Sequence, residues 1–337
     1  MKIHVLANDG SPLNVTMSTL MGTDPAQIGV GGAELAILTL CELWAKRGDE
    51  VVFYNNPREF GKSPFEQRNI TDFSPSEDRD ILMAFRSPNP RIEGARGMKI
   101  WWSHDQATTG SFKDFAPKVE KIIVNSPFHA DYFKKMYGIE NTIIIDEPVR
   151  TWEYERKDIQ KVSKRCIFCS VPDRGLKELL GMWQRIYHEV PEASLVITSD
   201  YRLWGVGYRG NEHYVNMAMR IPNVTFLGAV PRPRLVEEQL KAELLTFPNT
   251  YAELFCYAVV ECGIAGALPI TTPSAALDTT NMGIFARQEQ FADTVIRTLL
   301  LPQEELVKLQ KAVRDASFIR FSPERILKEW DTKVFGL

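Results

Sequence analysis

Glu253 and Glu261 are two carboxylates, eight positions apart, whose spacing could serve chemistry on a polar, anionic ligand. They flank the start of an apolar run, Phe255 to Ala265, that predicts a buried helix. The amides of Phe255 and Cys256 would then be first-turn donors without intrahelical partners, a ready site for a phosphate. Because Glu261 would lie about 12 Å further along the axis, the carboxylates could accept from the hydroxyls of a sugar and of a ribose. The alternative is a charge that stabilises the helix dipole plus one incidental glutamate.

The stretch Tyr251–Thr272 resembles the signature of retaining glycosyltransferases of family four, which have the GT-B fold. In that family the run reads E-x-F-G-x-x-x-x-E-A-x-x-x-G-x-P. This chain has Cys256 in place of the glycine after Phe and Cys262 in place of the alanine after the second Glu. Pro269 falls one position later than in the family.

This resemblance implies an α/β chain with two Rossmann-like domains that face each other across a cleft, and a terminal helix that crosses back to the first domain. We expect an N-terminal domain on the acceptor side over residues 1–150 and a C-terminal domain on the nucleotide-sugar donor side over 151–320. A C-terminal helix, 321–337, would pack back on the N-terminal domain. The resemblance is strong over 165–272, moderate over 29–54 and weakest over 55–149.

On the donor side, the resemblance assigns roles to the residues of the motif. Glu253, with the amides of Phe255 and Cys256, would hold the donor sugar. Glu261 would accept from the ribose hydroxyls. The segment that ends at Gly228 resembles the family segment whose backbone contacts the nucleotide base.

A basic residue and a glycine, Arg174 and Gly175, follow a predicted strand, Arg165–Ser170. They resemble the family's phosphate-clamping segment, so Arg174 would neutralise the diphosphate. The family's earlier, second arginine has no counterpart in this strand, which leaves Lys177 as a substitute by proximity. Since the helix dipole disfavours a cation at a helix start, the place of Arg174 argues for an anionic ligand, against the alternative of a solvated cation.

Gly31 and Gly32 open a predicted helix after a long loop, Asn8–Gln27, that follows the first strand, Lys2–Ala7. A dinucleotide fingerprint needs a tight turn straight after the strand. The long loop fits the N-terminal domain of family four better, where the two glycine amides approach the donor diphosphate. A tight helix entry without a ligand and a dinucleotide site remain the alternatives.

His104 follows the predicted strand Lys99–Trp102, at the carboxyl edge where open α/β sheets bind ligands. It resembles the family histidine that faces the transferred sugar, and the alternative is a structural histidine. The surrounding region is locally basic, so an anionic acceptor would fit, although a solvated basic face is the default. The cations of this region are Arg86, Arg91, Arg96 and Lys99.

Two short motifs are better explained by structure than by metal chemistry. Asp78 and Asp80 form a D-x-D that leads straight into an apolar strand, so turn chemistry accounts for them and no metal is predicted. Cys166 and Cys169 form a C-x-x-C within a buried strand, without a second Cys/His pair at zinc spacing. An odd number of cysteines, five, in a chain without a secretion signal predicts free thiols.

The length of 337 residues predicts two domains with ample core. With a net charge of -3, the chain has no basic field that would favour nucleic acid. The first residues predict a strand rather than a signal peptide, and no apolar stretch reaches the ~18 residues of a membrane span. We expect a cytoplasmic protein for which a peripheral membrane contact stays open.

The resemblance implies transfer of a sugar from a nucleoside diphosphate donor (a UDP- or GDP-sugar) to an acceptor hydroxyl, with retention of configuration and without a metal or a cofactor. Glu253, His104 and Arg174 would be catalytic, since charge builds on the leaving phosphate and on an oxocarbenium-like sugar. The acceptor stays open among saccharides, lipids, small molecules, proteins and modified nucleic acids. The alternatives are a sugar-nucleotide epimerase or phosphorylase on the same fold, a non-catalytic domain that binds a nucleotide sugar, and an NAD-dependent dehydrogenase.

Overall fold

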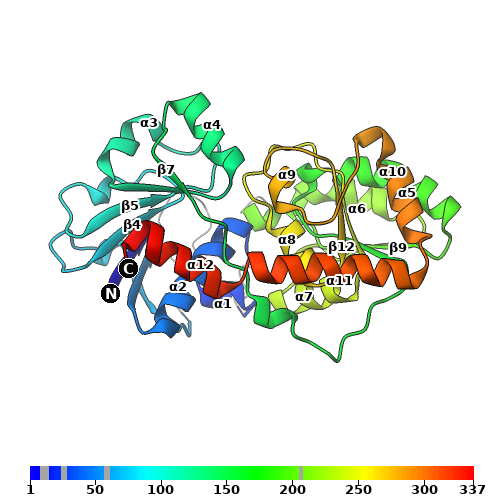
Figure 1. Cartoon of the computed structure of the whole chain (residues 1–337), viewed down its shortest axis with the longest axis horizontal. Coiled ribbons are helices and arrows are strands. Elements are labelled where there is room, and N and C mark those ends of the chain that lie inside the picture. The colour runs from blue at the N-terminus through cyan, green and yellow to red at the C-terminus, as the bar shows by residue number, and fades with distance from the viewer. Residues whose placement is uncertain (8–14, 24–28, 57–60, 205–207) are drawn as a thin grey trace. The chain divides into compact units, whose positions relative to one another are not determined.

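The computed structural model describes residues 1–7, 15–23, 29–56, 61–204 and 208–337 (Figure 1). Most of the predicted loop Asn8–Gln27 therefore lies outside the described residues, and its described part contains a short helix, α1 (Met17–Leu20). The chain forms two compact units. Unit 1 takes its described residues from Met1–Asp24, Val30–Pro148 and Pro323–Leu337, and unit 2 contains Gly29 and Val149–Ser322.

Unit 1 is built on a seven-stranded sheet in the order β3-β2-β1-β4-β5-β6-β7, and every neighbouring pair is parallel. Its central strands are almost entirely buried, which is typical of parallel sheets covered on both faces. The strands are β1 (Lys2–Leu6), β2 (Glu50–Asn55), β3 (Glu66–Asn69), β4 (Ile81–Phe85), β5 (Met98–Trp102), β6 (Lys121–Val124) and β7 (Thr142–Ile144). The helices are α1, α2 (Gly32–Arg47), α3 (Phe112–Phe115), α4 (Pro127–Tyr137) and α12 (Pro323–Glu329).

Unit 2 has a six-stranded parallel sheet in the order β10-β9-β8-β11-β12-β13. The strands are β8 (Arg165–Phe168), β9 (Ser194–Ile197), β10 (Val224–Phe226), β11 (Leu244–Phe247), β12 (Leu268–Thr271) and β13 (Ile284–Phe285). The helices are α5 (Leu176–Glu189), α6 (Glu212–Ala218), α7 (Arg232–Lys241), α8 (Tyr257–Ile264), α9 (Leu277–Thr280), α10 (Phe291–Leu299) and α11 (Gln303–Arg320).

Both sheets are doubly wound, so each has a point where the strand order reverses. In unit 1 the reversal lies between β1 and β4, and in unit 2 it lies between β8 and β11. Ligands of such sheets bind outside the carboxyl ends of the strands at this point. In unit 2 the loops that meet there begin after Phe168 and after Phe247.

The end of the chain packs on unit 1, as the resemblance predicts. Helix α12 lies beside α2 and is followed by a π-helical turn, Trp330–Phe335 (Figure 1). The Trp330 ring stacks edge-on against Trp44 and Trp102, with centroids 5.4 and 5.3 Å away. Lys121 of β6 donates to the carbonyl of Val334 at 2.6 Å. No helix among the described residues is long and apolar enough to cross a bilayer.

Candidate functional site

The two loops at the strand reversal of unit 2 touch through their backbones. The loop after β8 makes a 3₁₀ turn, Pro172–Arg174, and Gly175 then starts α5 with a φ of +97°. A Cβ on Gly175 would lie 2.2 Å from the carbonyl oxygen of Pro248, in the loop after β11. Only glycine fits both the left-handed conformation and this close approach. The contact fixes Arg174 beside the loop that carries Glu253.

Arg174 and Glu253, both predicted site residues, form an ion pair in which Nε donates to Oε1 at 2.8 Å. The Arg174 guanidinium also lies over the Tyr251 ring, 3.4 Å from its centroid. The two side chains are 12% and 16% exposed, so the pair is largely buried but still reached by solvent. Burial raises the pKa of Glu253, and Arg174 opposes that rise. A ligand could separate the pair, because a phosphate can bind the guanidinium and a hydroxyl can donate to the carboxylate.

Helix α8 begins two residues later than the sequence predicts, at Tyr257 instead of Phe255. The Phe255 ring is buried against the rings of Tyr257 and Phe321, and its carbonyl accepts from Thr280 Oγ1 at 2.9 Å. Cys256 then turns the chain as N-cap with φ +84° and ψ 81°. The amides of Phe255 and Cys256 therefore precede the first helical turn. Cys256 stands where the family signature has glycine, and its positive φ is the physical reason why glycine suits that position.

The carboxylate of Glu261 is buried within α8 and already has partners. Arg232 Nη2 lies 2.5 Å from Oε1, and both side chains are 4% exposed. Gln239 Nε2 donates to Oε2 at 3.4 Å, and the Gln239 oxygen in turn accepts from Tyr154 at 2.7 Å. Arg232, Gln239 and Tyr154 could not be predicted from the sequence, because no local pattern shows that residues about 80 positions apart will pair.

The Gly228 segment, predicted to contact the base, is anchored by a buried aspartate. Gly228 has a φ of +71°, and the amide of Ala229 donates to Asp200 at 3.1 Å. Asp200 also accepts from Arg202 and Asn211. Burial works to raise the pKa of Asp200, but these hydrogen bonds outweigh burial and hold it below its usual value. The anchor fixes the backbone of this segment, which is what a backbone contact to a ligand requires.

Three other residues predicted to contact the diphosphate lie at helix starts. Lys177 is exposed in the first turn of α5. Gly31 is the N-cap of α2 with extended backbone, and Gly32 is the exposed first residue of that helix. With no side chains at these two positions, the first-turn amides of α2 can be approached closely.

In unit 1 the His104 side chain is only 2% exposed. Its Nδ1 lies 3.3 Å from Glu147 and 3.2 Å from the Asn125 amide, while its buried Nε2 has no hydrogen-bond partner among the described residues. The rings of Phe85 and Trp102 pack against its ring, with centroids 4.9 and 4.4 Å away. Burial, helped by nearby positive charge, lowers the pKa of His104 well below its usual value, so the imidazole is neutral at pH 7.

Arg86, at the carboxyl end of β4, is charge-compensated. It has a positive φ of 67° and pairs with Glu34 at 2.7 Å and with Asp105 at 2.6 Å. Lys99, another cation of the locally basic region, lies at the amino end of β5 near Glu120. These basic residues therefore do not gather at one edge of the sheet.

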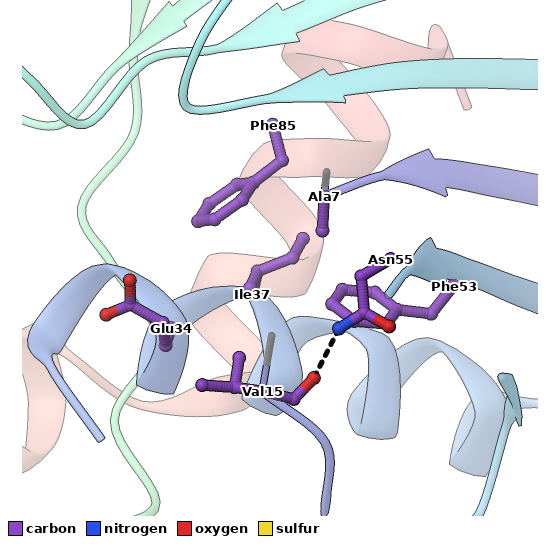
Figure 2. Close-up of a pocket in the computed structure, with 7 residues that line it drawn as sticks. All are labelled: Ala7, Val15, Glu34, Ile37, Phe53, Asn55 and Phe85. Atoms are coloured by element: carbon purple, nitrogen blue, oxygen red, sulfur yellow. Dashed lines mark hydrogen bonds between the residues drawn. The ribbon is translucent and has the colours of Figure 1, made fainter. Parts of the chain in front are cut away.

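Glu34 also lines a small hollow in unit 1, shown in Figure 2. Its volume of about 10 Å³ holds at most one water, so it is not a substrate pocket. The lining is Ala7, Val15, Glu34, Ile37, Phe53, Asn55 and Phe85.

The motifs weighed for metal binding have structural roles. Asp80 accepts from the amide of Lys2 at 2.7 Å. Cys166 is buried in β8, and the sulfur of Cys169 lies 3.6 Å from that of Cys262 as a pair of free thiols. Among the residues that the structure describes, no three His, Cys, Asp or Glu side chains are grouped to hold a metal ion.

No protein-family model and no curated protein matches the sequence. Solved structures do match. HepE of Anabaena, in complex with UDP and glucose, is 14% identical with a TM-score of 0.74 over 100% of both chains. The sucrose-phosphate synthase of Thermosynechococcus elongatus is 14% identical with a TM-score of 0.73, over 100% of this chain and 99% of that one. AviGT4, a glycosyltransferase involved in avilamycin A biosynthesis, is 16% identical with a TM-score of 0.70, over the same shares. This chain is similar to them in fold, which is GT-B.

Proposed function

We propose that the protein is a glycosyltransferase that moves a sugar from a nucleoside diphosphate donor to an acceptor hydroxyl, with retention and without a metal. The observation that carries the proposal is the Arg174–Glu253 pair at the strand reversal of unit 2. A guanidinium suits the diphosphate, and a carboxylate suits the sugar hydroxyls. HepE, which has the same fold, binds UDP-glucose, and this supports a UDP-sugar as the first donor to test.

In this reaction a diphosphate would draw Arg174 away from Glu253. The freed carboxylate would accept from the donor sugar and face the positive charge that grows on it as the glycosidic bond breaks. Arg174 would meanwhile stabilise the charge that develops on the leaving phosphate. The segment before α8, with Phe255 and Cys256, would line the sugar, and Lys177 would add a second positive charge.

His104 would take part as a neutral hydrogen-bonding group. If Nδ1 carries the proton and donates it to Glu147, Nε2 would be an acceptor for a hydroxyl. The roles of His104, Gly31 and Gly32 follow from the resemblance and stay predictions that mutagenesis can test.

The test is to incubate the protein with UDP-, GDP- and ADP-sugars, with a panel of acceptors, and to follow the released nucleoside diphosphate. We expect one donor to be consumed, slowly with water and faster with the right acceptor, and NMR of the product to show the anomeric configuration of the donor. Glu253→Gln is the inactive comparison. If nucleotide sugars bind but none is consumed with any acceptor, the protein is a binding domain. Tight binding of NAD without binding of any nucleotide sugar would instead favour a dehydrogenase.

A further inference from the structure

Four buried side chains of unit 2 form a closed ring around the carboxylate of Glu261. Tyr154 donates to Gln239 Oε1 at 2.7 Å, and Gln239 Nε2 donates to Glu261 Oε2 at 3.4 Å. Arg232 Nη2 closes the ring, because it lies 2.5 Å from Glu261 Oε1 and 3.3 Å from the Tyr154 hydroxyl. The carboxylate is thus held from both of its oxygens by Arg232 and Gln239 of α7, which the hydroxyl of Tyr154 links to each other.

The ring pairs one basic side chain, Arg232, with one acidic side chain, Glu261, and is shielded from solvent. No member is more than 4% exposed. Arg232 Nε also donates a hydrogen bond to Glu153 at 2.7 Å. This bond connects Arg232 to the turn that carries Tyr154. Burial works to lower the pKa of Arg232, but Glu261 and the other neighbours outweigh it and raise it well above its ordinary value. Arg232 therefore keeps its charge beside the buried carboxylate of Glu261.

The ring does not use up the capacity of the carboxylate. An ionised carboxylate has about four acceptor positions, and the ring supplies one neighbour to each oxygen. Oε1 has the Arg232 charge beside it but no hydrogen bond of good geometry among the described residues. A buried ion pair of this kind contributes little net stability. The lone pairs that the ring leaves free are enough to accept from two hydroxyls.

Arg232 is also close in sequence to the predicted base-binding segment. It is the first residue of α7, four positions after Gly228, whose segment is anchored by Asp200. A short stretch of chain therefore joins the predicted base-binding segment to the ring around Glu261.

We infer that Arg232 is a positioning residue for the nucleotide: it holds Glu261 in the orientation that accepts from the ribose hydroxyls. This rests on the proposed function, in which Glu261 contacts the ribose. The consequence is specific, because discrimination between ribose and 2′-deoxyribose should depend on an arginine that need not touch the nucleotide. A residue that only supports the fold would change the affinity for both nucleotides by the same factor.

The experiment compares UDP with 2′-deoxy-UDP by titration calorimetry, and GDP with 2′-deoxy-GDP if the donor panel selects guanine. The wild-type protein should bind the ribonucleotide about tenfold more tightly, as expected for one lost hydrogen bond to a charged group. Arg232→Met, which keeps the length and removes the charge, should bring this ratio close to one. Arg232→Lys should retain part of it. The matched control is Arg234→Met in the same helix, at an exposed arginine paired with Glu237 and Glu238, and it should leave the ratio unchanged.

A second variant guards against simple misfolding. Arg232→Met leaves Glu261 buried without its cation, so Arg232→Met/Glu261→Gln, which removes both charges, is measured alongside and should also give a ratio near one. A wild-type ratio in either folded variant would overturn the inference. Equal binding of both nucleotides by the wild-type protein would overturn it too and leave the proposed function standing. If the wild-type protein binds no nucleotide at all, the proposed function itself fails and the inference fails with it.

Discussion

Arg174 Nε lies 2.8 Å from Glu253 Oε1, so the two residues predicted to handle opposite parts of the donor are bound to each other in this structure. The pair is joined across 79 positions of the chain by the contact of Gly175 with Pro248. In this arrangement each group compensates the charge of the other. The arrangement also lets their roles be separated by experiment, because a nucleoside diphosphate without sugar should need only the arginine.

Arg174→Met should weaken UDP binding by about 10- to 100-fold, since it removes a charge-assisted contact to phosphate. Glu253→Gln should leave UDP affinity unchanged or improve it, because a carboxylate next to an anion is lost, while transfer falls by about 100-fold or more. Calorimetry with UDP and a transfer assay check the two results. Arg185→Met is the control, since Arg185 is an exposed arginine of α5 paired with Asp293. Equal effects of Arg174→Met and Arg185→Met on UDP affinity would refute the phosphate role.

Gly175→Ala should destabilise unit 2 by more than about 3 kcal/mol and abolish nucleotide binding, because its Cβ would collide with the Pro248 carbonyl at 2.2 Å. The control is Gly48→Ala, at the C-terminal end of α2. Gly48 has nearly the same φ, +101° against +97°, but no atom lies within 4 Å of its added Cβ. Its cost should be about 1 kcal/mol, from backbone strain alone. Chemical denaturation measures both, and similar losses in the two variants would show that the Pro248 contact is unimportant.

Cys256→Gly should stabilise the protein by about 1 kcal/mol, since glycine adopts a φ of +84° without the strain that a Cβ brings. Cys256→Ala keeps the Cβ and should show no such gain. Thermal unfolding of the two variants and of the wild-type protein makes the comparison. Equal stabilities of the alanine and glycine variants would mean that Cys256 is not strained.

Stability should fall as the pH drops from 6.5 to about 4, and His4 should account for part of this. Its Nδ1 accepts from Arg79 Nε at 3.1 Å, with Tyr54 and Glu77 close by. Burial, followed by Arg79, lowers the pKa of His4 to about 4. Between that pH and 6.5 the unfolded state binds the extra proton, so about 3 kcal/mol is lost across this window.

His4→Asn should flatten this dependence, because the Asn oxygen can accept from Arg79 and does not titrate. Urea unfolding at pH 7 and at pH 4.5 gives the comparison between wild type and variant. The buried His129, whose pKa is lowered to about 3, contributes equally to both proteins and cancels in the difference. Parallel pH profiles for the two proteins would contradict the assignment.

The sequence predicts most strands because parallel strands buried on both faces are continuous apolar runs. The predicted strands Lys2–Ala7 and Lys99–Trp102 agree within one residue at each end with β1 and β5. The edge strand β3, Glu66–Asn69, has no such pattern, since its residues are polar and only partly buried. It forms because its backbone pairs with β2, which no local pattern reveals.

The candidate site was predictable to the extent that it lies on loops after strands. Arg174 and Glu253 were each expected there, and the structure brings them together. The start of α8 was misplaced, because Phe255 is anchored by distant aromatic rings and the turn depends on the conformation of Cys256. Arg232 could not be found from sequence, since its partners are set by how α7 and α8 pack.

The Trp330 ring packs between Trp44 and Trp102, and Trp102 in turn packs on His104. Unit 1 is discontinuous in sequence: apart from Gly29, unit 2 is formed by Val149–Ser322, and the polypeptide completes unit 1 only from Pro323 onward. Loss of the last fifteen residues would remove part of the core of unit 1 and a support of His104, although those residues are the farthest in sequence from β1. A C-terminal truncation of this protein should therefore destabilise it in the way that a mutation in the hydrophobic core does.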